Sequence, residues 1–311
     1  MKTLLKSALA FAGLGLILYG AVYYASERLV YRTGDSNPFF KIATAEDRAY
    51  DWVILGASHA MPLDFADFNA EMERETGLRI LNLATPGTGP LYNRFVLERF
   101  FKRYRTRRVL YVLDSFAFYS AQWNEDRFAD AKLLRRTPFD PALAWQFLRY
   151  SLNDGVRAMA VLDYVTGFSK INNRERFKPD IWEGESKFDR VARPSAAADR
   201  KRIEYLYPEP DPLVFSRYLG VMKTLNALAR QADAQVVAIK MPVPARFHSQ
   251  LPDQAAFNDA ISRSLAADNV PFHDFSEDMD EPGFYFDTDH LNRAGLTAFF
   301  SRYLKAILVT D

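Results

Sequence analysis

The segment DWVILGASH, residues 51–59, joins an apolar run to a turn of small residues that ends on a serine and a histidine. Short, nearly continuous apolar runs are typical of strands that are buried on both faces of a parallel sheet. Similar runs recur along the chain, separated by polar turns. The sequence therefore predicts five strands, at residues 52–55, 79–83, 108–113, 235–239 and 270–272.

Amphipathic segments alternate with these strands. Helices are predicted at residues 65–76, 91–104, 216–231 and 254–267, and a last helix follows Asn292, where apolar residues recur every three or four positions. Strand–helix alternation predicts the α/β class, with an open parallel sheet and right-handed crossovers. The expected architecture is a three-layer αβα sandwich, as the family resemblance described below also implies. Residues 114–215 are too many for one crossover, so we expect a long helical insertion there.

The N-terminal segment from Ser7 to Ser26 contains no charged residue. A helix of roughly 20 residues is about 30 Å long, which matches the apolar thickness of a bilayer. We therefore predict a membrane anchor at residues 1–32, a linker at 33–50 and one α/β domain at 51–311. The alternative is a cleaved signal peptide. Lys2 and Lys6 favour a cytoplasmic N-terminus, with the globular part on the periplasmic or extracellular side of the inner membrane.

Composition excludes several function classes. Lys and Arg total 40 and Asp and Glu total 39, a net charge of +1 that argues against a dedicated nucleic-acid binder. The chain has no cysteine, which excludes disulfides, thiolate metal sites and cysteine nucleophiles. We expect no cofactor and no metal, because the cluster Asp114, Asp287, Asp289 and His290 lacks close ligand spacing.

Candidate catalytic residues follow the strands, because ligands bind beyond the carboxyl ends of such sheets. Ser58 lies in the turn after the first strand, and Asp287 and His290 stand three apart before the last helix. A serine nucleophile needs a base, and the base needs a carboxylate to orient it. We predict Ser58 as nucleophile, His290 as base and Asp287 as its orienting carboxylate, with Asp289 as the alternative. The backbone N–H groups of Ser58 and Gly87 can receive an oxyanion.

Together these blocks resemble the SGNH (GDSL-type) hydrolase superfamily. Gly56-x-Ser58 follows the first strand, Gly87 follows the second, and Asp287-x-x-His290 precedes the C-terminal helix, which is the order of that family. The resemblance covers roughly residues 51–308, interrupted by the insertion. It implies a three-layer α/β fold, a covalent acyl-enzyme on the serine, the roles given above and an oxyanion donor at the glycine.

Two blocks depart from the family pattern. The first reads Gly-Ala-Ser-His rather than Gly-Asp-Ser, and the third reads Leu113-Asp114-Ser115 where the family has Gly-x-Asn-Asp. The family's asparagine donates to the oxyanion, and losing one such donor costs ~10²–10³ in rate. Ser115, Asn82 and His59 are the candidates to take its place.

With a membrane helix in front, the chain looks most like SGNH-type proteins of bacterial envelopes that act beside membrane-bound O-acyltransferases. That resemblance implies a membrane-anchored serine esterase or O-acyltransferase, with a glycan or wall polymer as acceptor and acetyl as the expected acyl group. Two alternatives stay open. One is a non-catalytic partner or scaffold of a membrane-bound O-acyltransferase, and the other is a glycan-binding module without chemistry.

Overall fold

A computed structural model describes residues 1–207 and 212–310, and its centre is a five-stranded parallel sheet of order β2-β1-β3-β4-β5. Register pairs Trp52 with Ile80 on one side of β1 and Val53 with Val109 on the other. The predicted α/β class with an open parallel sheet is confirmed. The strands are β1 (Ala49–Leu55), β2 (Ile80–Asn82), β3 (Arg105–Val112), β4 (Gln235–Lys240) and β5 (Phe272–Asp274).

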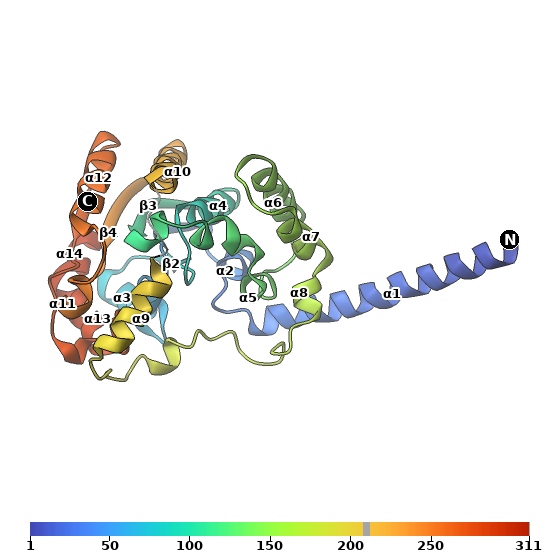
Figure 1. Ribbon diagram of the computed structural model, residues 1–311, viewed down its shortest axis with the longest axis horizontal. Helices are drawn as coiled ribbons and strands as arrows, with labels where there is room; N and C mark the ends of the chain where they lie inside the picture. Colours follow the sequence, from blue (N-terminus) through green and yellow to red (C-terminus); the bar gives the residue numbers. More distant parts are fainter. Residues whose placement is uncertain (208–211, 311) are drawn as a thin grey trace. The chain divides into compact units, whose positions relative to one another are not determined.

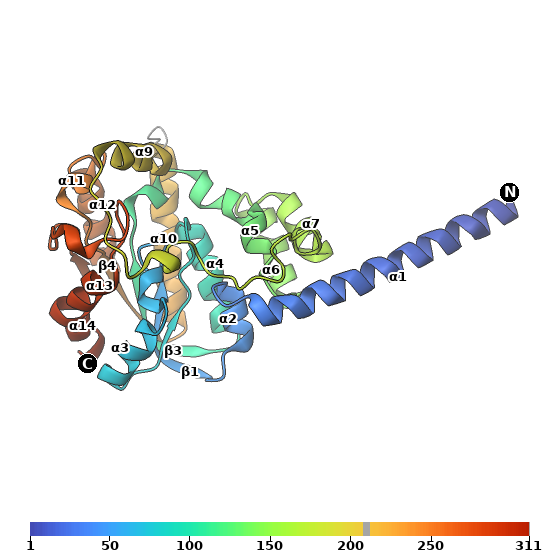
Figure 2. The same ribbon diagram turned by 90° about the horizontal axis from the view of Figure 1, so that it is seen from below.

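Helices cover both faces of this sheet (Figure 2). One face packs Trp52 and Ile54 into an apolar core with α3 (Phe68–Thr76) and α13 (Arg293–Phe299). The other face carries α4 (Pro90–Phe101), α10 (Pro212–Gln231) and α12 (Gln254–Ala267), which contact one another. The three layers are therefore helix, sheet and helix.

The C-terminal segment packs into the apolar core that contains Trp52 and Ile54. Asn292 caps α13 by accepting a hydrogen bond from the N–H of Gly295 at 2.9 Å, as the sequence predicts. The helix continues through a π-helical turn, η7 (Phe300–Leu304), into α14 (Lys305–Val309). The indole N–H of Trp52 donates to the carbonyl of Leu308 at 3.1 Å, which ties this end of the chain to β1.

The chain divides into two compact units, each described here by itself (Figure 1). The sheet unit contains residues 44–127 and 181–311, and the N-terminal unit contains residues 1–43 and 128–180. The N-terminal unit is built from α1 (Lys2–Thr33), α2 (Pro38–Thr44), α5 (Ala131–Leu134), α6 (Pro141–Asn153), α7 (Ala158–Thr166) and α8 (Phe168–Ile171).

Short helices complete the sheet unit. They are α9 (Ala196–Leu206), α11 (Ala245–His248) and the 3₁₀ turns η1 (Met61–Asp64), η2 (Ser115–Phe118), η3 (Ala121–Trp123), η5 (Glu185–Lys187) and η6 (Pro282–Phe284). A further 3₁₀ turn, η4 (Glu125–Ala129), spans the boundary between the units.

This division differs from the predicted boundaries at two places. The expected linker, residues 33–50, contains α2, whose Phe39 and Ile42 are buried. Asn37 is a helix cap rather than a loop residue, because its side-chain oxygen accepts from the N–H groups of Phe39 and Phe40. The expected insertion, residues 114–215, is also not one body. Only residues 128–180 pack with the N-terminal helix, and the remainder belongs to the sheet unit.

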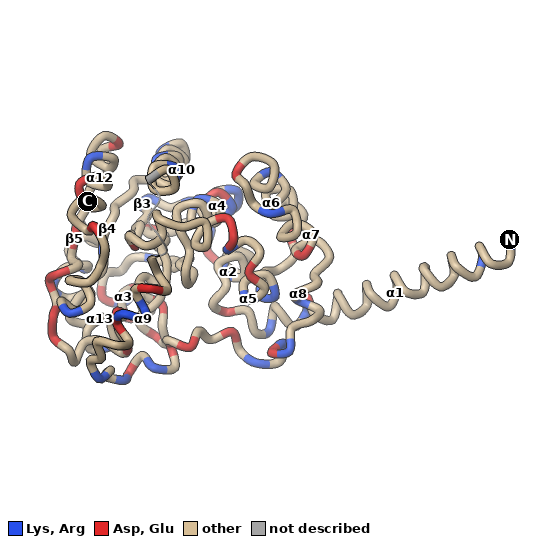
Figure 3. Tube along the Cα trace, viewed as in Figure 1, with Lys and Arg blue, Asp and Glu red and all other residues tan. Residues whose placement is uncertain are grey.

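Helix α1 is 32 residues long, with a mean hydropathy of 1.7 over its most apolar stretch. Figure 3 shows no charged residue along its length between Lys6 and Glu27. By length and composition the helix can cross a bilayer, a property that a signal sequence shares.

Candidate active site

Asp287 and His290 form a hydrogen-bonded pair in the turn before α13. His290 Nδ1 lies 2.9 Å from Asp287 Oδ1 and 3.0 Å from Oδ2. The backbone N–H groups of His290 and Asp289 also donate to Asp287 Oδ1, at 2.9 and 3.1 Å. Burial alone would raise the pKa of Asp287, but His290 and these hydrogen bonds outweigh it and lower the pKa. The carboxylate is therefore ionised at neutral pH and holds Nδ1 of His290.

The other ring nitrogen of His290 is left without a partner. His290 is 1% exposed, and its Nε2 is a buried atom with no hydrogen-bond partner in the described structure. Buried polar atoms are nearly always paired, so an orphan of this kind calls for an explanation. A general base has such an unpaired nitrogen, because this atom accepts a proton from the reacting group once substrate is bound.

Ser58 lies in the turn that leaves β1 at the carboxyl edge of the sheet. Gly56 starts this turn at φ +150°, and a side-chain carbon there would lie 2.9 Å from the carbonyl of Val112. Asn93 accepts from the N–H of Gly56 at 3.0 Å, and the Thr88 hydroxyl donates to its carbonyl at 3.1 Å. A glycine is required because the backbone passes so close to β3.

The Ser58 side chain is buried, and the residue that follows it packs against His290. Ser58 is 4% exposed, and the ring of the next residue, His59, stacks on His290 with centroids 4.7 Å apart. Within residues 1–207 and 212–310, no hydrogen bond joins the Ser58 hydroxyl to the His290 imidazole. Catalytic hydrogen bonds are often long or poorly aligned before substrate binds, so a nucleophile and its base need not be bonded to each other in the free protein.

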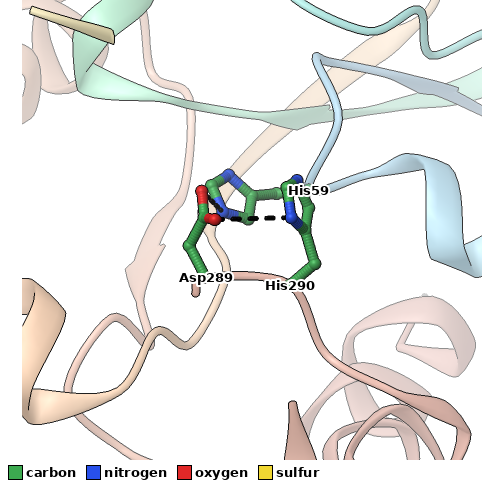
Figure 4. A group of neighbouring side chains, drawn as sticks. All are labelled: His59, Asp289 and His290. Carbon is green, nitrogen blue, oxygen red and sulfur yellow. Dashed lines mark ion pairs between the residues drawn. The ribbon is translucent and has the colours of Figure 1, made fainter. Parts of the chain in front are cut away.

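His59 lies between the carboxylates of Asp114 and Asp289. Figure 4 shows the one from Asp289. Its Nδ1 is 2.5 Å from Asp114 Oδ1, and its Nε2 is 3.3 Å from Asp289 Oδ2. The second contact is an ion pair without hydrogen-bond geometry. Burial lowers the pKa of His59, but the two carboxylates overcome that effect and raise the pKa to about 10. His59 is therefore a buried cation next to Ser58 at neutral pH.

Asp289 is 0% exposed and is surrounded by positive charge. Besides His59, it contacts Nε of Arg202 from α9 at 3.2 Å. Burial alone would raise its pKa, but the cationic neighbours hold the pKa well below the ordinary value. Its distance to His290 Nδ1 is 3.5 Å, against 2.9 Å for Asp287. The geometry therefore favours Asp287 over Asp289 as the orienting carboxylate.

His59, Asp289 and His290 also offer ligand atoms within 4.8 Å of one another, which is the donor set of a metal site. They fit a metal poorly. The two imidazole planes are stacked at 29°, so their in-plane lone pairs do not converge on one point. The raised pKa of His59 also keeps a proton where a metal would need a lone pair.

Two backbone N–H groups in the turns after β1 and β2 are unpaired in the described part of the chain. The N–H groups of Ser58 and Gly87 make no hydrogen bond within the described residues. Gly87 has φ +63°, a left-handed conformation that fixes the turn after β2. These are the two oxyanion donors that the sequence predicts.

Two of the three candidates for the missing asparagine have other tasks. Asn82 donates to the carbonyl of Ala60 at 2.8 Å and accepts from the N–H of Ala84, so it fastens together the turns after β1 and β2. The Ser115 hydroxyl is 2.5 Å from the Tyr207 hydroxyl and also bonds Gln254. The side chains of Asn82 and Ser115 thus already have hydrogen-bond partners, whereas Nε2 of His59 has none in the described structure.

Sequence reasoning missed the partners of His59. The sequence places Asp114 at the end of its strand but does not link it to His59, and it predicts no role for Arg202. The only sequence signal for Asp114 is its position after an apolar strand at the same edge as Ser58. Arg202 has no local signal, because it reaches Asp289 from a helix 87 residues earlier in the chain.

No protein-family model matches the chain, and no curated protein matches it by sequence. Among solved structures, it is similar to a candidate acylhydrolase of Bacteroides fragilis, with 11% identity, a TM-score of 0.39, and 86% of this chain and 92% of that chain covered. It is also similar to a GDSL-like lipase of Bacteroides thetaiotaomicron, with 10% identity, a TM-score of 0.37 and coverage of 85% and 92%. At these values, function has to be argued from the side chains.

Proposed function

We propose that the chain is a serine esterase or O-acyltransferase that works through a covalent acyl-enzyme. Ser58 Oγ attacks the ester carbonyl while its proton passes to Nε2 of His290. The tetrahedral intermediate then expels the alcohol, which takes that proton from His290 and leaves the acyl group on Ser58. Water or an acceptor hydroxyl reverses these steps. Asp287 keeps His290 oriented and stabilises the imidazolium that forms.

The observation that carries this proposal is the His290 ring. Asp287 occupies its Nδ1, and its Nε2 is buried and without a partner, at the sheet edge where the turn with Ser58 ends. The free N–H groups of Ser58 and Gly87 supply oxyanion donors. The positive charge of His59 adds electrostatic stabilisation of an anion formed on the neighbouring residue.

For the biological reaction we propose acyl transfer at the bacterial envelope. The apolar helix α1 supports an anchor in the inner membrane, with the sheet unit on the periplasmic side. The resemblance to SGNH-type proteins supports acetyl esters of glycans or wall polymers as substrates, and a membrane-bound O-acyltransferase as partner. Measuring acetyl release to water against transfer to a glycan acceptor separates hydrolysis from transfer.

A fluorophosphonate probe tests the nucleophile. Wild type should be labelled, and Ser58→Ala and His290→Ala should not. Ser264→Ala is a matched control, because Ser264 is also buried (5% exposed) but lies on α12 outside the site. Labelling and ester turnover that survive Ser58→Ala would contradict the mechanism.

The second candidate is a non-catalytic partner of an O-acyltransferase. It is favoured by the third sequence block, where Asp114 binds His59 and no asparagine is present. In a strain that lacks the chain, complementation by Ser58→Ala would support this partner role. Loss of complementation, with the same protein level as wild type, would support the enzyme.

A further inference from the structure

Two helices of the N-terminal unit expose apolar side chains. On α6 the exposed positions are spaced three and four residues apart, and on α7 they are three apart, so each helix carries an apolar stripe. Large apolar surfaces left exposed on a protein mark interaction sites. We refer to the exposed residues of the two stripes together as the apolar hairpin face: Trp145, Leu148 and Leu152 on α6 (67, 37 and 74% exposed), and Met159, Leu162 and Val165 on α7 (66, 53 and 45%).

The exposed apolar residues are additional to those that form the hydrophobic core of this unit. The opposite sides of the same helices are also apolar, and they are already buried: Phe147 and Tyr150 on α6, and Tyr164 on α7. Phe147 and Tyr164 stack with ring centroids 4.8 Å apart. Each helix therefore buries one apolar side inside the N-terminal unit and leaves a second apolar side exposed.

Helix α1 fixes the depth of this hairpin. The Tyr19 hydroxyl donates to the carbonyl of Thr166, the last residue of α7, at 2.7 Å. Tyr19 precedes Ser26, the end of the uncharged stretch, by seven residues, or about 10 Å along a helix. Further along α1, Glu27 forms an ion pair with Lys170 of α8. The end of α7 is thus held beside the last third of the apolar stretch of α1 (Figures 1 and 2).

An apolar groove continues the same surface. It has a volume of about 470 Å³ and is lined by Tyr19 of α1 together with Met159, Leu162 and Phe168. Phe168 is 62% exposed. The groove therefore connects the apolar surface of α1 with that of α7. Its one charged lining residue is Asp163, whose carboxylate accepts hydrogen bonds from the N–H and the hydroxyl of Ser169.

From this continuity we infer that the apolar hairpin face is a membrane-binding surface, seated in the interfacial layer of the bilayer that α1 crosses. The inference rests on the membrane placement of α1 and not on the proposed esterase chemistry. A bilayer is the occupant because Tyr19 and Thr166 hold α7 at the depth where acyl chains meet headgroups. Amphipathic helices bind this layer with the apolar side inward. The hairpin then gives the unit a second attachment besides α1.

Cysteine scanning tests this surface without background, because the chain contains no cysteine. Leu152→Cys and Met159→Cys are labelled with an environment-sensitive fluorophore in the full chain, reconstituted in phosphatidylcholine–phosphatidylglycerol vesicles. Both positions are largely exposed, so the substitutions leave the packing intact. Leu14→Cys in α1 is the membrane reference, and Lys223→Cys on α10 is the exposed reference.

We expect probes at Leu152 and Met159 to emit at shorter wavelength than the probe at Lys223. They should be quenched by lipids brominated near the headgroup and lose most of their quenching by aqueous iodide. The probe at Leu14 should respond to deeper bromines. Iodide quenching of the Leu152 and Met159 probes equal to that at Lys223 would overturn the proposal.

Two other results would also overturn it. Probes that respond only after native envelope membranes are added, and not in pure lipid, would assign the face to a protein partner. Quenching of the Leu14 probe by aqueous iodide would show that α1 does not lie in the bilayer, and the premise of the proposal would be wrong. Fluorophosphonate labelling of the same vesicles is independent of all three, so a failed enzymatic proposal and a failed membrane surface are distinguishable.

Discussion

The imidazole rings of His59 and His290 stack with their centroids 4.7 Å apart and their planes at 29°. Each ring places its Nδ1 on a different carboxylate, Asp114 for His59 and Asp287 for His290. Their electrostatic settings differ. The pKa of His59 is raised to about 10, so this ring keeps its proton, whereas Nε2 of His290 faces no partner. One pair supplies a fixed positive charge and the other supplies a base.

Replacing His59 should change stability in a pH-dependent way. Its pKa rises from 6.5 to about 10 on folding, so its contribution is fully present below pH 6.5 and is lost as the pH rises through 10. His59→Gln should lower the free energy of unfolding by several kcal/mol at pH 6, with a shrinking difference towards pH 10. Urea unfolding at a series of pH values measures this difference.

His273→Gln is the control for that series, because His273 is an exposed histidine on β5. It should leave the unfolding free energy nearly unchanged at each pH. A His59→Gln difference that is constant from pH 6 to pH 10 would contradict the assigned charge state.

Substitution by asparagine should have different effects at Asp287 and at Asp289, on turnover at the first and on stability at the second. Asp287→Asn removes the acceptor that orients His290, and in a serine triad this change lowers kcat by about 10⁴ with the fold retained. Asp289→Asn instead removes the buried counter-charge of Arg202 and leaves His59 with Asp114 alone, which costs about 3–5 kcal/mol of stability. Ester turnover and thermal unfolding, measured on both variants, separate the two roles. A larger loss of turnover in Asp289→Asn at full folding would reverse the assignment.

Much of the sheet was predictable because its signals are local. Helix α12 is predicted at 254–267 and lies at those residues, and each of the five predicted strands overlaps a strand of the sheet. The overlap is smallest for β5, which is predicted at 270–272 and lies at Phe272–Asp274. The start of β3 was missed by three residues. Arg105 and Arg107 are exposed charged residues at the beginning of the strand, and they carry no apolar signal.

The site was predictable in part for the same reason. The turn that joins Asp287 to His290 is encoded within four residues, so spacing alone indicates the pair. The cationic group around Asp289 is assembled from His59, Arg202 and the turn itself, which no local pattern connects. The split of the expected insertion between two units depends likewise on packing between distant segments.

Replacing Arg202 should change how the stability of the protein depends on pH in the acid range. With Arg202 and the histidines beside it, Asp289 has a pKa well below its ordinary value, so its stabilisation is present above about pH 4 and is lost as the pH falls further. Arg202→Gln weakens this effect and should lower stability by about 2–3 kcal/mol at pH 7, since the guanidinium is partly exposed. The loss relative to wild type should shrink as Asp289 becomes protonated.

Circular dichroism during acid titration measures this difference, and Arg200→Gln is the matched control. Arg200 is exposed on the same helix, α9, two residues away. It should behave like wild type. Equal acid midpoints for Arg202→Gln and wild type would show that Arg202 does not stabilise the buried carboxylate.

Gly87 and Gly77 allow the oxyanion turn to be tested against a pure backbone effect. Both glycines are left-handed, at φ +63° and +71°, so alanine costs about 1–2 kcal/mol at either position. At Gly77 an added methyl group meets open space, but at Gly87 it would lie 2.9 Å from the ring of Trp123. Gly77→Ala should therefore lose only that stability and keep full turnover.

Gly87→Ala should lose more stability and also lower kcat, because the turn must shift and carry its N–H away from the oxyanion. Displacing one oxyanion donor lowers kcat by ~10²–10³. Kinetics with a short-chain nitrophenyl ester and thermal unfolding compare the two variants, and equal kcat values for them would remove Gly87 from the oxyanion site.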